Sequence, residues 1–427
     1  DWSSDVCSSD LVVLLYVCVC AVGMATAQLR PTNEELGSIY FAYPTPAVVQ
    51  TPPPAGFEAF YISHYGRHGS RWRTDDVHYK RVVDVFDSLA TVHALTTLGE
   101  DVRGRLHRVW EDARGRSGNI TPLGERQHHD IAYRMFTSFP SVFADSAVVD
   151  ARSSTSLRCA MSMSYFTEAL KEQNPRLCVS RRAYQCYMDY IAHTSPEAEA
   201  FCSDTVAWRA DFRRFEREQI QPERFVKALV TLPVRMSYEQ ERKLMEDIYW
   251  IAIDMQNCDH LKGVAFFDLF TYDELMALWK VVNARMYVCN AAAPLNGGLM
   301  PRQATALLRN IVESADKAIA AGRPCADLRF GHDTHLIRLL ALMGIEGCNG
   351  READIEKFHL AWQDYRVSPM AANLQLIFFR NAGGQILVKL LHNEHEVRLT
   401  GLAPASGPYY RWADLRRHLW GLLDEAD

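Results

Sequence analysis

The pattern of apolar and polar positions differs between the middle of the chain and its two ends, and the first part of the chain combines strand and helix patterns. Phe57 to Tyr65 is an aromatic and β-branched run, which predicts a buried strand, and Gly66 ends it. Thr121 followed by Pro122 is typical of a helix start, with the threonine as cap and the proline in the first turn. Apolar residues at helical spacing predict further helices over about 76–95, 99–114 and 156–171, and a short β-branched run predicts a strand over 148–152.

The pattern changes between residues 175 and 290, where charged, aromatic and helix-forming residues dominate and strand signals are few. Strands and helices then alternate again, with a β-hairpin across the polar turn at 381–384. The elements predicted here are helices over 302–321, 334–343 and 412–423, and strands over 327–331, 373–380 and 385–392. We therefore expect an α/β domain formed by residues 28–174 and 291–427, with residues 175–290 inserted as a mostly helical cap.

Residues 1–27 have the pattern of a signal peptide. Residues 11–23 form an apolar run that is too short for a stable transmembrane helix, and Ala25-Thr26-Ala27 is an A-x-A cleavage site. Residues 1–10 contain no starting methionine and no Lys or Arg, so we interpret this decapeptide as a non-native addition. We expect an exported protein, periplasmic or secreted, without a stable membrane span.

Charge and cysteine content narrow the class of protein. With 46 basic and 52 acidic side chains, the chain has a formal net charge of −6 and lacks the basic excess typical of nucleic-acid-binding proteins, so we expect no nucleic-acid partner. An even number of cysteines in an exported chain permits disulfides without defining their pairing, and free buried thiols are an equal alternative. No Cys-x-x-Cys or other zinc-site spacing occurs, so we expect no metal and no cofactor. The eight cysteines beyond the expected cleavage site are Cys159, Cys178, Cys186, Cys202, Cys258, Cys289, Cys325 and Cys348.

The densest polar signal is Arg67-His68-Gly69-Ser70-Arg71, directly after the first predicted strand. Ligands of open α/β sheets bind beyond the carboxyl ends of the strands. Two guanidiniums can hold phosphate oxygens through charge-assisted bonds, and a neutral imidazole between them can attack phosphorus. Gly69 lets the backbone approach closely. The alternative is a solvated basic loop with a surface histidine.

Two later segments repeat this layout of strand, polar residues and helix. In the first, residues 330–335, the carboxyl group of Asp333 can protonate a leaving oxygen, and His332 can hold a phosphate oxygen. The alternative there is a capping aspartate beside a structural histidine. In the second, Arg152 and Arg158 lie at another strand-to-helix junction, where a surface salt bridge is the alternative.

Together these segments resemble the histidine acid phosphatases, the second branch of the histidine phosphatase superfamily. Residues 67–71 match the Arg-His-Gly-x-Arg signature, residues 332–334 resemble the acid-bearing motif, and residues 152–158 are similar to the segment between them. Residues 121–124 also resemble a family turn. The resemblance covers roughly residues 57–392. It implies a central mixed sheet flanked by helices, with an inserted α-helical cap, and a small-molecule phosphomonoester as the substrate.

The resemblance also implies roles for individual residues. His68 would become phosphorylated, and Asp333 would act as the general acid and then assist the attacking water. The phosphate would be held by Arg67, Arg71, Arg158 and His332, with Arg158 rather than Arg152 at the phosphate-binding position of the motif. No metal is implied.

Residues that flank the motifs indicate a subgroup within the histidine acid phosphatases. Residues 61–71 and 369–373 look like bacterial multiple inositol polyphosphate phosphatases, which makes phytate-like substrates plausible. Two positions depart from the expected patterns: Trp72 replaces a small residue, and His-Asp-Thr replaces the His-Ala-Glu frequent in that subgroup. The departure at Asp333 leaves the positional preference on the inositol ring open.

A polyanionic substrate should be accompanied by extra cations around the pocket. The candidates are Arg73, Lys80, Arg181 and Arg182, each with an ordinary exposed charge as the alternative. The aromatic residues between 208 and 250 have helical spacing, which favours cap core over a ligand surface. Rival functions are a broad-specificity acid phosphatase, a phosphomutase-like enzyme and a non-catalytic phospholigand-binding protein.

Overall fold

A computed structural model describes residues 30–45, 49–203, 205–231 and 235–426. The expected signal peptide, residues 1–27, lies outside the described residues. All of the helices and strands named below belong to one compact unit, which begins at Asn33.

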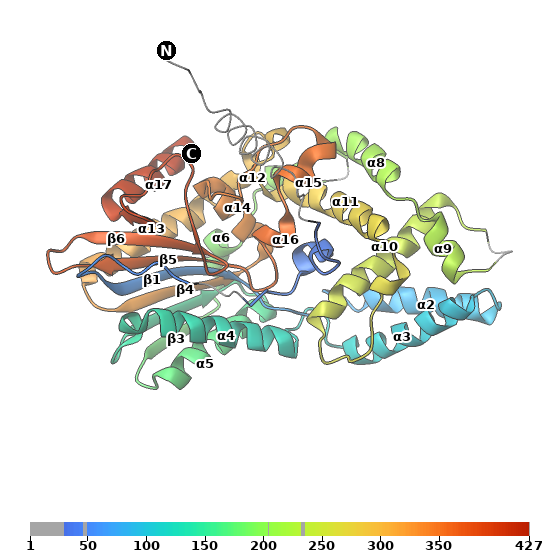
Figure 1. The fold of residues 1–427 in the computed structure, drawn as a ribbon, viewed down its shortest axis with the longest axis horizontal. Helices are drawn as coiled ribbons and strands as arrows, with labels where there is room; N and C mark the ends of the chain where they lie inside the picture. The colour runs from blue at the N-terminus through green and yellow to red at the C-terminus, as the bar shows by residue number, and fades with distance from the viewer. Residues whose placement is uncertain (1–29, 46–48, 204, 232–234, 427) are drawn as a thin grey trace, which may run out of the picture. The chain divides into compact units, whose positions relative to one another are not determined.

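A mixed β-sheet forms the centre of this unit (Figure 1). Within the described residues it has eight strands, in the order β3-β2-β4-β1-β5-β6-β7, with β8 also paired to β6. Strands β3, β2, β4 and β1 are parallel, and β5 and β6 continue the sheet antiparallel. The strands are β1 (Glu58–Arg67), β2 (Val148–Ser153), β3 (Cys178–Arg182), β4 (Cys325–Gly331), β5 (Asn373–Arg380), β6 (Ile386–His392), β7 (His395–Val397) and β8 (Tyr409–Arg411).

Helices cover both faces of the sheet because the central strands bury side chains on both sides. Along β1, Tyr61 and Tyr65 belong to the larger apolar cluster, and Ile62 belongs to the second one. The second cluster contains the apolar faces of α4 (Pro122–Ser138) and α5 (Leu157–Gln173). On the opposite face lie α13 (Thr305–Ala321), α14 (Asp333–Met343) and α17 (Trp412–Ala426) (Figure 1).

A second group of helices gathers beyond one end of the strands (Figure 1). Helix α10 packs against α2 and α9, and α11 packs against α8. The members are α2 (Val77–Thr91), α3 (Thr97–Ala113), α8 (Trp208–Gln219), α9 (Glu223–Leu229), α10 (Tyr238–Asp254) and α11 (Tyr272–Asn290). The shorter helices are α6 (Met188–Ile191), α7 (Pro196–Phe201), α12 (Leu299–Arg302), α15 (Phe358–Ala361) and α16 (Asp364–Val367), and the 3-10 helix η1 (Glu35–Tyr40) precedes the sheet.

The elements predicted from the sequence occur with ends shifted by a few residues. Thr121 caps α4 by accepting a hydrogen bond from the backbone N–H of Gly124, and Pro122 is the first helical residue. Strands β5 and β6 form the predicted hairpin. The expectation of few strands after residue 175 missed β3, which pairs with β2 and extends the sheet. Strand β3 is a short, partly exposed edge strand with a polar sequence, so it carries no strong apolar signal. Helices α2 and α3 lie within residues 28–174, the segment expected to form part of the α/β domain. However, α2 packs against α10 and α3 packs against α9, two helices of the expected cap.

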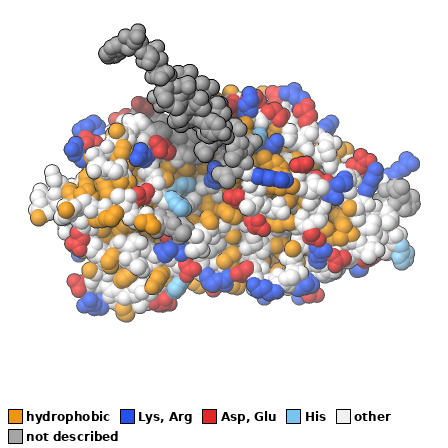
Figure 2. Space-filling view, in the orientation of Figure 1, with side chains coloured by type: hydrophobic (Ala, Val, Ile, Leu, Met, Phe, Trp, Pro, Cys, Tyr) orange, Lys and Arg blue, Asp and Glu red, His pale blue; other side chains and the backbone are white. Residues whose placement is uncertain are grey.

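Three further features bear on the sequence expectations. The eight described cysteines are free thiols. Among the described residues, no helix has the length and apolar character needed to cross a bilayer. On the face drawn in Figure 2, basic and acidic side chains are interspersed.

Candidate functional site

Three sequence motifs meet at the carboxyl ends of β1, β4 and β2. The strand register places Arg67 opposite Gly331, and Ser153 opposite Phe330. Two backbone hydrogen bonds extend this register beyond the strands. The N–H of His68 donates to the carbonyl of Gly331 (3.0 Å), and that of Ser154 donates to the carbonyl of Phe330 (3.0 Å). Parallel pairing therefore brings together segments that are far apart in the sequence.

The imidazole of His68 is buried, with 2% of the residue exposed. Its Nδ1 lies 3.0 Å from the carbonyl oxygen of Gly69. A carbonyl can only accept, so this contact favours the tautomer with hydrogen on Nδ1 and leaves the lone pair on Nε2. Burial, reinforced by Arg67 and Arg71, holds the pKa of His68 well below its usual range. The ring is therefore a neutral base, as nucleophilic attack requires.

Arg67 is fully buried and held at both ends of its guanidinium. Nη1 donates to the carbonyl oxygens of Ile39 (2.6 Å) and Ser368 (2.7 Å), and Nη2 lies 3.1 Å from Oδ2 of Asp333. Neither carbonyl was foreseen from the sequence. These contacts fix the guanidinium beside the predicted acid.

Arg71 is oriented by Tyr40, a residue of η1 that carries no recognisable signal in the sequence. Both Nη atoms of Arg71 donate to the hydroxyl of Tyr40 at 3.2 Å, and Nη1 also donates to the carbonyl of Trp72. The guanidinium carbon lies 4.9 Å from the centre of the tyrosine ring. Nε of Arg71 is buried and has no partner among the described residues.

His332 lies between the first and third motifs. Its ring centre is 5.7 Å from that of His68, and its Nδ1 lies 3.4 Å from Nη2 of Arg158. The hydroxyl of Ser154 lies 3.2 Å from Nε2, a contact that residue-type arguments missed although Ser154 lies inside the third motif. Burial and the neighbouring Arg158 lower the pKa of His332 to about 4. Arg152 instead pairs with Asp150 at 2.6 Å, so of the two arginines only Arg158 is placed at His332.

Asp333 is the first residue of α14, with 15% of its side chain exposed. Its Oδ1 accepts a hydrogen bond from the backbone N–H of Thr334 (2.7 Å). Burial alone would raise the pKa of this carboxyl, but Arg67 and the other positive groups hold it below its ordinary value. In the ligand-free site Asp333 is therefore a carboxylate at neutral pH.

Gly69 allows the close backbone approach that the sequence suggested. A Cβ at this position would lie 2.7 Å from the carbonyl oxygen of Gly124, at the start of α4. A Cβ at Gly124 would lie 2.2 Å from the carbonyl oxygen of Ser70. The two glycines therefore allow the loop after β1 to rest directly on the first turn of α4.

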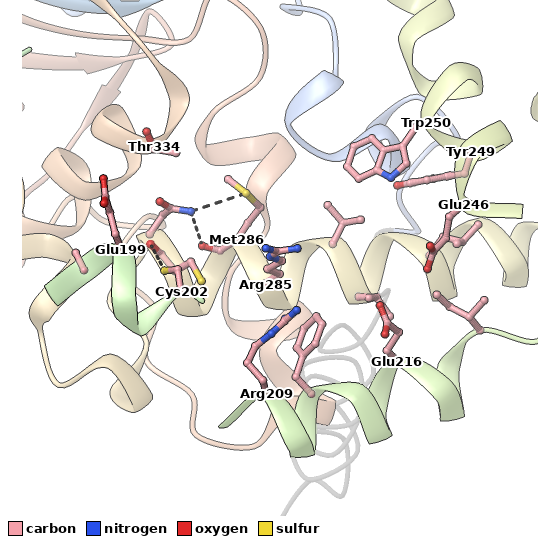
Figure 3. Close-up of a pocket in the computed structure, with 18 of the residues that line it drawn as sticks. Glu199, Cys202, Arg209, Glu216, Glu246, Tyr249, Trp250, Arg285, Met286 and Thr334 are labelled. Carbon is pink, nitrogen blue, oxygen red and sulfur yellow. Dashed lines mark hydrogen bonds between the residues drawn. The ribbon is translucent and has the colours of Figure 1, made fainter. Parts of the chain in front are cut away.

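A cavity of about 620 Å³ adjoins the site (Figure 3). It lies among helices α7, α8, α10, α11 and α14, and Thr334 connects its wall with the neighbouring Asp333. Arg209 from α8 and Arg285 from α11 point toward one another across it (Figure 3). The aromatic residues of this region belong to the apolar core or pack against it, as expected, and Trp250 also forms part of the cavity wall. The charged lining residues are Arg209, Arg285, Arg338, Glu199, Glu216 and Glu246.

Three of the four extra cations considered from the sequence are engaged in other contacts. Lys80 pairs with Asp84, Arg181 donates to Thr167 (2.6 Å), and Arg182 donates to Asp150 (3.0 Å). Arg73 differs, because it is buried and lies over the ring of Trp250.

His64, His128 and His129 do not belong to the candidate site formed by the three motifs. His64 and His128 are buried against Phe166 and Phe330, and burial lowers both of their pKa values to about 3. His129 is at the surface, where it lies 2.8 Å from Glu172. Within the described ranges, no group of three or more His, Cys, Asp or Glu side chains is arranged to hold a metal ion.

The family comparison spans all three motifs. The model for the histidine phosphatase superfamily (branch 2) matches residues 66–393. The chain belongs to this family and is a phosphatase. No protein of the curated set is significantly similar in sequence.

Solved structures share the fold at low sequence identity. The multiple inositol polyphosphate phosphatase of Bifidobacterium longum, in complex with inositol hexasulfate, has a TM-score of 0.73 at 17% identity, covering 90% of this chain and 97% of that chain. The phytase from D. castellii has a TM-score of 0.66 at 15% identity, covering 94% and 88%. The Hafnia alvei phytase in complex with myo-inositol hexakis sulphate has a TM-score of 0.53 at 14% identity, covering 88% and 99%.

Proposed function

We propose that the protein hydrolyses phosphomonoesters through a phosphohistidine at His68. The observation that carries this proposal is the state of His68 itself. Its Nδ1 faces the carbonyl of Gly69, its pKa is depressed, and Arg67 and Arg71 come from the same loop. A neutral Nε2 next to fixed positive charges is the arrangement that attack on a phosphate dianion needs.

In the first half-reaction, Nε2 of His68 attacks phosphorus and the bond from phosphorus to the ester oxygen breaks. The guanidiniums of Arg67, Arg71 and Arg158 offset the negative charge of the transferring group, and His332 holds one of its oxygens. Asp333 gives its proton to the leaving oxygen, so the alcohol departs neutral. The products are the alcohol and the phosphohistidine.

In the second half-reaction, water attacks phosphorus and the N–P bond breaks. The carboxylate of Asp333 takes the proton of the water, which restores the acid for the next cycle. His68 returns as a neutral ring because Gly69 still accepts its Nδ1 hydrogen. The cycle is balanced with water as the only co-reactant, and no metal or organic cofactor takes part in it.

Asp333 needs a proton for the first step, although Arg67 lowers its pKa in the free site. A bound phosphate dianion offsets the positive charge of Arg67 and so raises the pKa of Asp333. Acidic conditions also supply the proton. The proposal therefore includes an acidic working range.

Inositol polyphosphates such as phytate are the proposed substrate class. The Bifidobacterium longum and Hafnia alvei proteins that share the fold were solved with inositol hexasulfate and myo-inositol hexakis sulphate, respectively. The cavity beside Asp333 has a volume of about 620 Å³, and its lining contains three arginines that can hold phosphate groups, together with three glutamates. A volume of roughly 300–1,000 Å³ is typical of small-molecule sites. The apolar run at 11–23 and the cleavage site after it support export to the periplasm or the exterior.

Phosphate release from phytate and from p-nitrophenyl phosphate, at acidic pH with a chelator present, tests the proposal. We expect release from both substrates by the wild type, and loss of both activities in His68→Ala. His129→Ala, which removes an exposed imidazole paired with Glu172, is the matched control and should behave as the wild type. Rapid acid-free quenching and peptide mass analysis should locate the phosphoryl group on His68.

The alternatives give different results in the same experiment. Equal efficiency on both substrates would indicate a broad-specificity acid phosphatase. Transfer of phosphate to a second hydroxyl without release would indicate a phosphomutase-like enzyme. Binding of phytate without turnover would indicate a phospholigand-binding protein.

A further inference from the structure

Arg73 is a buried cation without a hydrogen-bonding partner for most of its guanidinium. The residue is 6% exposed, and its Nε and Nη1 are inaccessible to water and unpaired among the described residues. Its backbone is fixed on both sides, because its N–H donates to the hydroxyl of Tyr79 (2.8 Å) and its carbonyl accepts from Gly118 (2.7 Å). Buried arginines are nearly always paired, so this one lacks an expected anion.

The side chain of Arg73 packs against Trp250, one of the residues that line the cavity. Its guanidinium carbon is 5.4 Å from the ring centre of Trp250, which lines the cavity and is labelled in Figure 3. The Trp250 ring meets the ring of Tyr40 edge-on, with centres 5.7 Å apart. Tyr40 in turn carries the guanidinium of Arg71. The rings of Tyr40 and Trp250 thus lie between the guanidinium of Arg71 and that of Arg73.

Among the described residues, Asp254 is an acidic side chain that lies close enough to both Arg71 and Arg73 to interact with their charges. Asp254 is fully buried, and its Oδ2 accepts a hydrogen bond from Tyr79 (2.6 Å) while its Oδ1 has no partner. Burial raises its pKa to about 6, against the opposing effect of Tyr79, Arg71 and Arg73. As the pH falls through about 6, Asp254 becomes protonated and offsets less of the positive charge of Arg71 and Arg73.

We propose that Arg73, placed by Trp250, binds a second phosphate group of the substrate, one that is not being hydrolysed. The ligand class is a ring compound that carries at least two phosphates, one at His68 and another at Arg73. This inference rests on the proposed function, because it assigns the non-reacting part of a substrate that is cleaved at His68. It makes Arg73 a specificity-determining residue that acts on polyphosphates and not on simple monophosphates.

The test compares Arg73→Gln with Arg116→Gln in the full-length protein. Arg116 is a matched control, since it also lies over a tryptophan ring, that of Trp72, but its side chain is 52% exposed and pairs with Asp112. Two quantities are measured: the kcat/KM for phytate and for p-nitrophenyl phosphate, and the calorimetric Kd of inositol hexasulfate and of inorganic phosphate.

In Arg73→Gln we expect the kcat/KM for phytate to fall, and the Kd of inositol hexasulfate to rise, by about tenfold or more, the effect of losing one charge-assisted hydrogen bond. The values for p-nitrophenyl phosphate and inorganic phosphate should stay at those of the wild type. Arg116→Gln should change none of the four values.

Two results would overturn the inference: an unchanged Kd for inositol hexasulfate, or equal losses on both substrates. If Arg73→Gln does not fold, Arg73→Lys keeps the positive charge without the planar fork and should weaken hexasulfate binding selectively. The calorimetric arm needs no turnover. A wild type that releases phosphate from neither substrate would therefore overturn the proposed function while the role of Arg73 in binding is still measured.

Discussion

Arg67 and Asp333 form an ion pair at the carboxyl edge of the sheet, with 3.1 Å between Nη2 and Oδ2. The pair joins the proposed phosphate-binding group to the proposed acid. In the free site, Arg67 keeps Asp333 deprotonated. We expect a bound phosphate to compete with the carboxylate for this guanidinium, so that substrate binding and protonation of Asp333 favour one another.

Replacing Asp333 by Asn should separate substrates by their leaving groups. The amide cannot supply a proton, so we expect kcat for phytate to fall by about 10²–10⁴-fold. Nitrophenolate leaves without protonation, and its release should be affected much less. The measurement is the burst and steady-state rate on both substrates. Dephosphorylation also uses Asp333 and is common to both substrates, so the burst rates decide: equal losses of burst rate on the two substrates would show that Asp333 does not act as the acid.

Activity should decline as the pH rises from the acidic range. The pKa of His68 lies well below its usual value, so this ring stays neutral there and does not limit the rate. The pKa of free Asp333 is also low, so its protonated fraction shrinks about tenfold per pH unit above that value. The kcat/KM of the wild type, measured from about pH 3 to about pH 8, should fall on the alkaline side. A rate that rises steadily into alkali would contradict this assignment.

Arg158 and Arg152 should differ in their effects on phosphate binding. Arg158→Gln removes a guanidinium that lies beside His332, and the inhibition constant of inorganic phosphate should rise by about tenfold or more. Arg152→Gln removes a partly exposed ion pair with Asp150, so the inhibition constant should not change and the free energy of unfolding should fall by about 1 kcal/mol or less. Similar inhibition constants for the two variants would remove Arg158 from the site.

The stability of the site should depend on Asp364, which is fully buried. Its carboxylate accepts hydrogen bonds from Ser38 (2.5 Å) and Trp279 (2.9 Å), and so ties η1, the segment that carries Ile39 and Tyr40, to α11. Asp364→Ala leaves these donors unpaired and should lower the free energy of unfolding by about 2–4 kcal/mol.

Chemical denaturation measures this change. Asp414→Ala, at a largely exposed carboxylate, is the control and should stay within about 0.5 kcal/mol of the wild type. If Asp364→Ala is equally stable, the hydrogen bonds of Asp364 do not contribute to holding η1.

Much of the sheet and the core of the site could be predicted from the sequence. Buried strands such as β1 and β4 are recognisable because their apolar runs end at polar motifs, and parallel pairing then brings these motifs to one edge. The positions of Arg67, His68 and Asp333 follow from this rule. Strand β3 could not be predicted in this way, because a polar edge strand lacks the apolar run that marks a buried strand.

The groups that orient the site could not be predicted. Tyr40 contacts Arg71 from a segment before the sheet, and Ile39 and Ser368 act through backbone carbonyls, which carry no residue-type information. Trp250 packs against the core, as its helical spacing predicts, but such spacing does not show that the residue also lines a cavity.

The pairing of β1 with β4 also bears on how the protein folds. Tyr61 is opposite Cys325 in the central pair of the sheet, so most of the chain must be synthesised before these strands can meet. Contacts of such long sequence separation form slowly. Strands β5 and β6, which lie later still, complete the sheet. A nascent chain therefore carries the loop after β1 without Asp333 of α14, and we expect hydrolytic activity to arise only when nearly the whole polypeptide has been made.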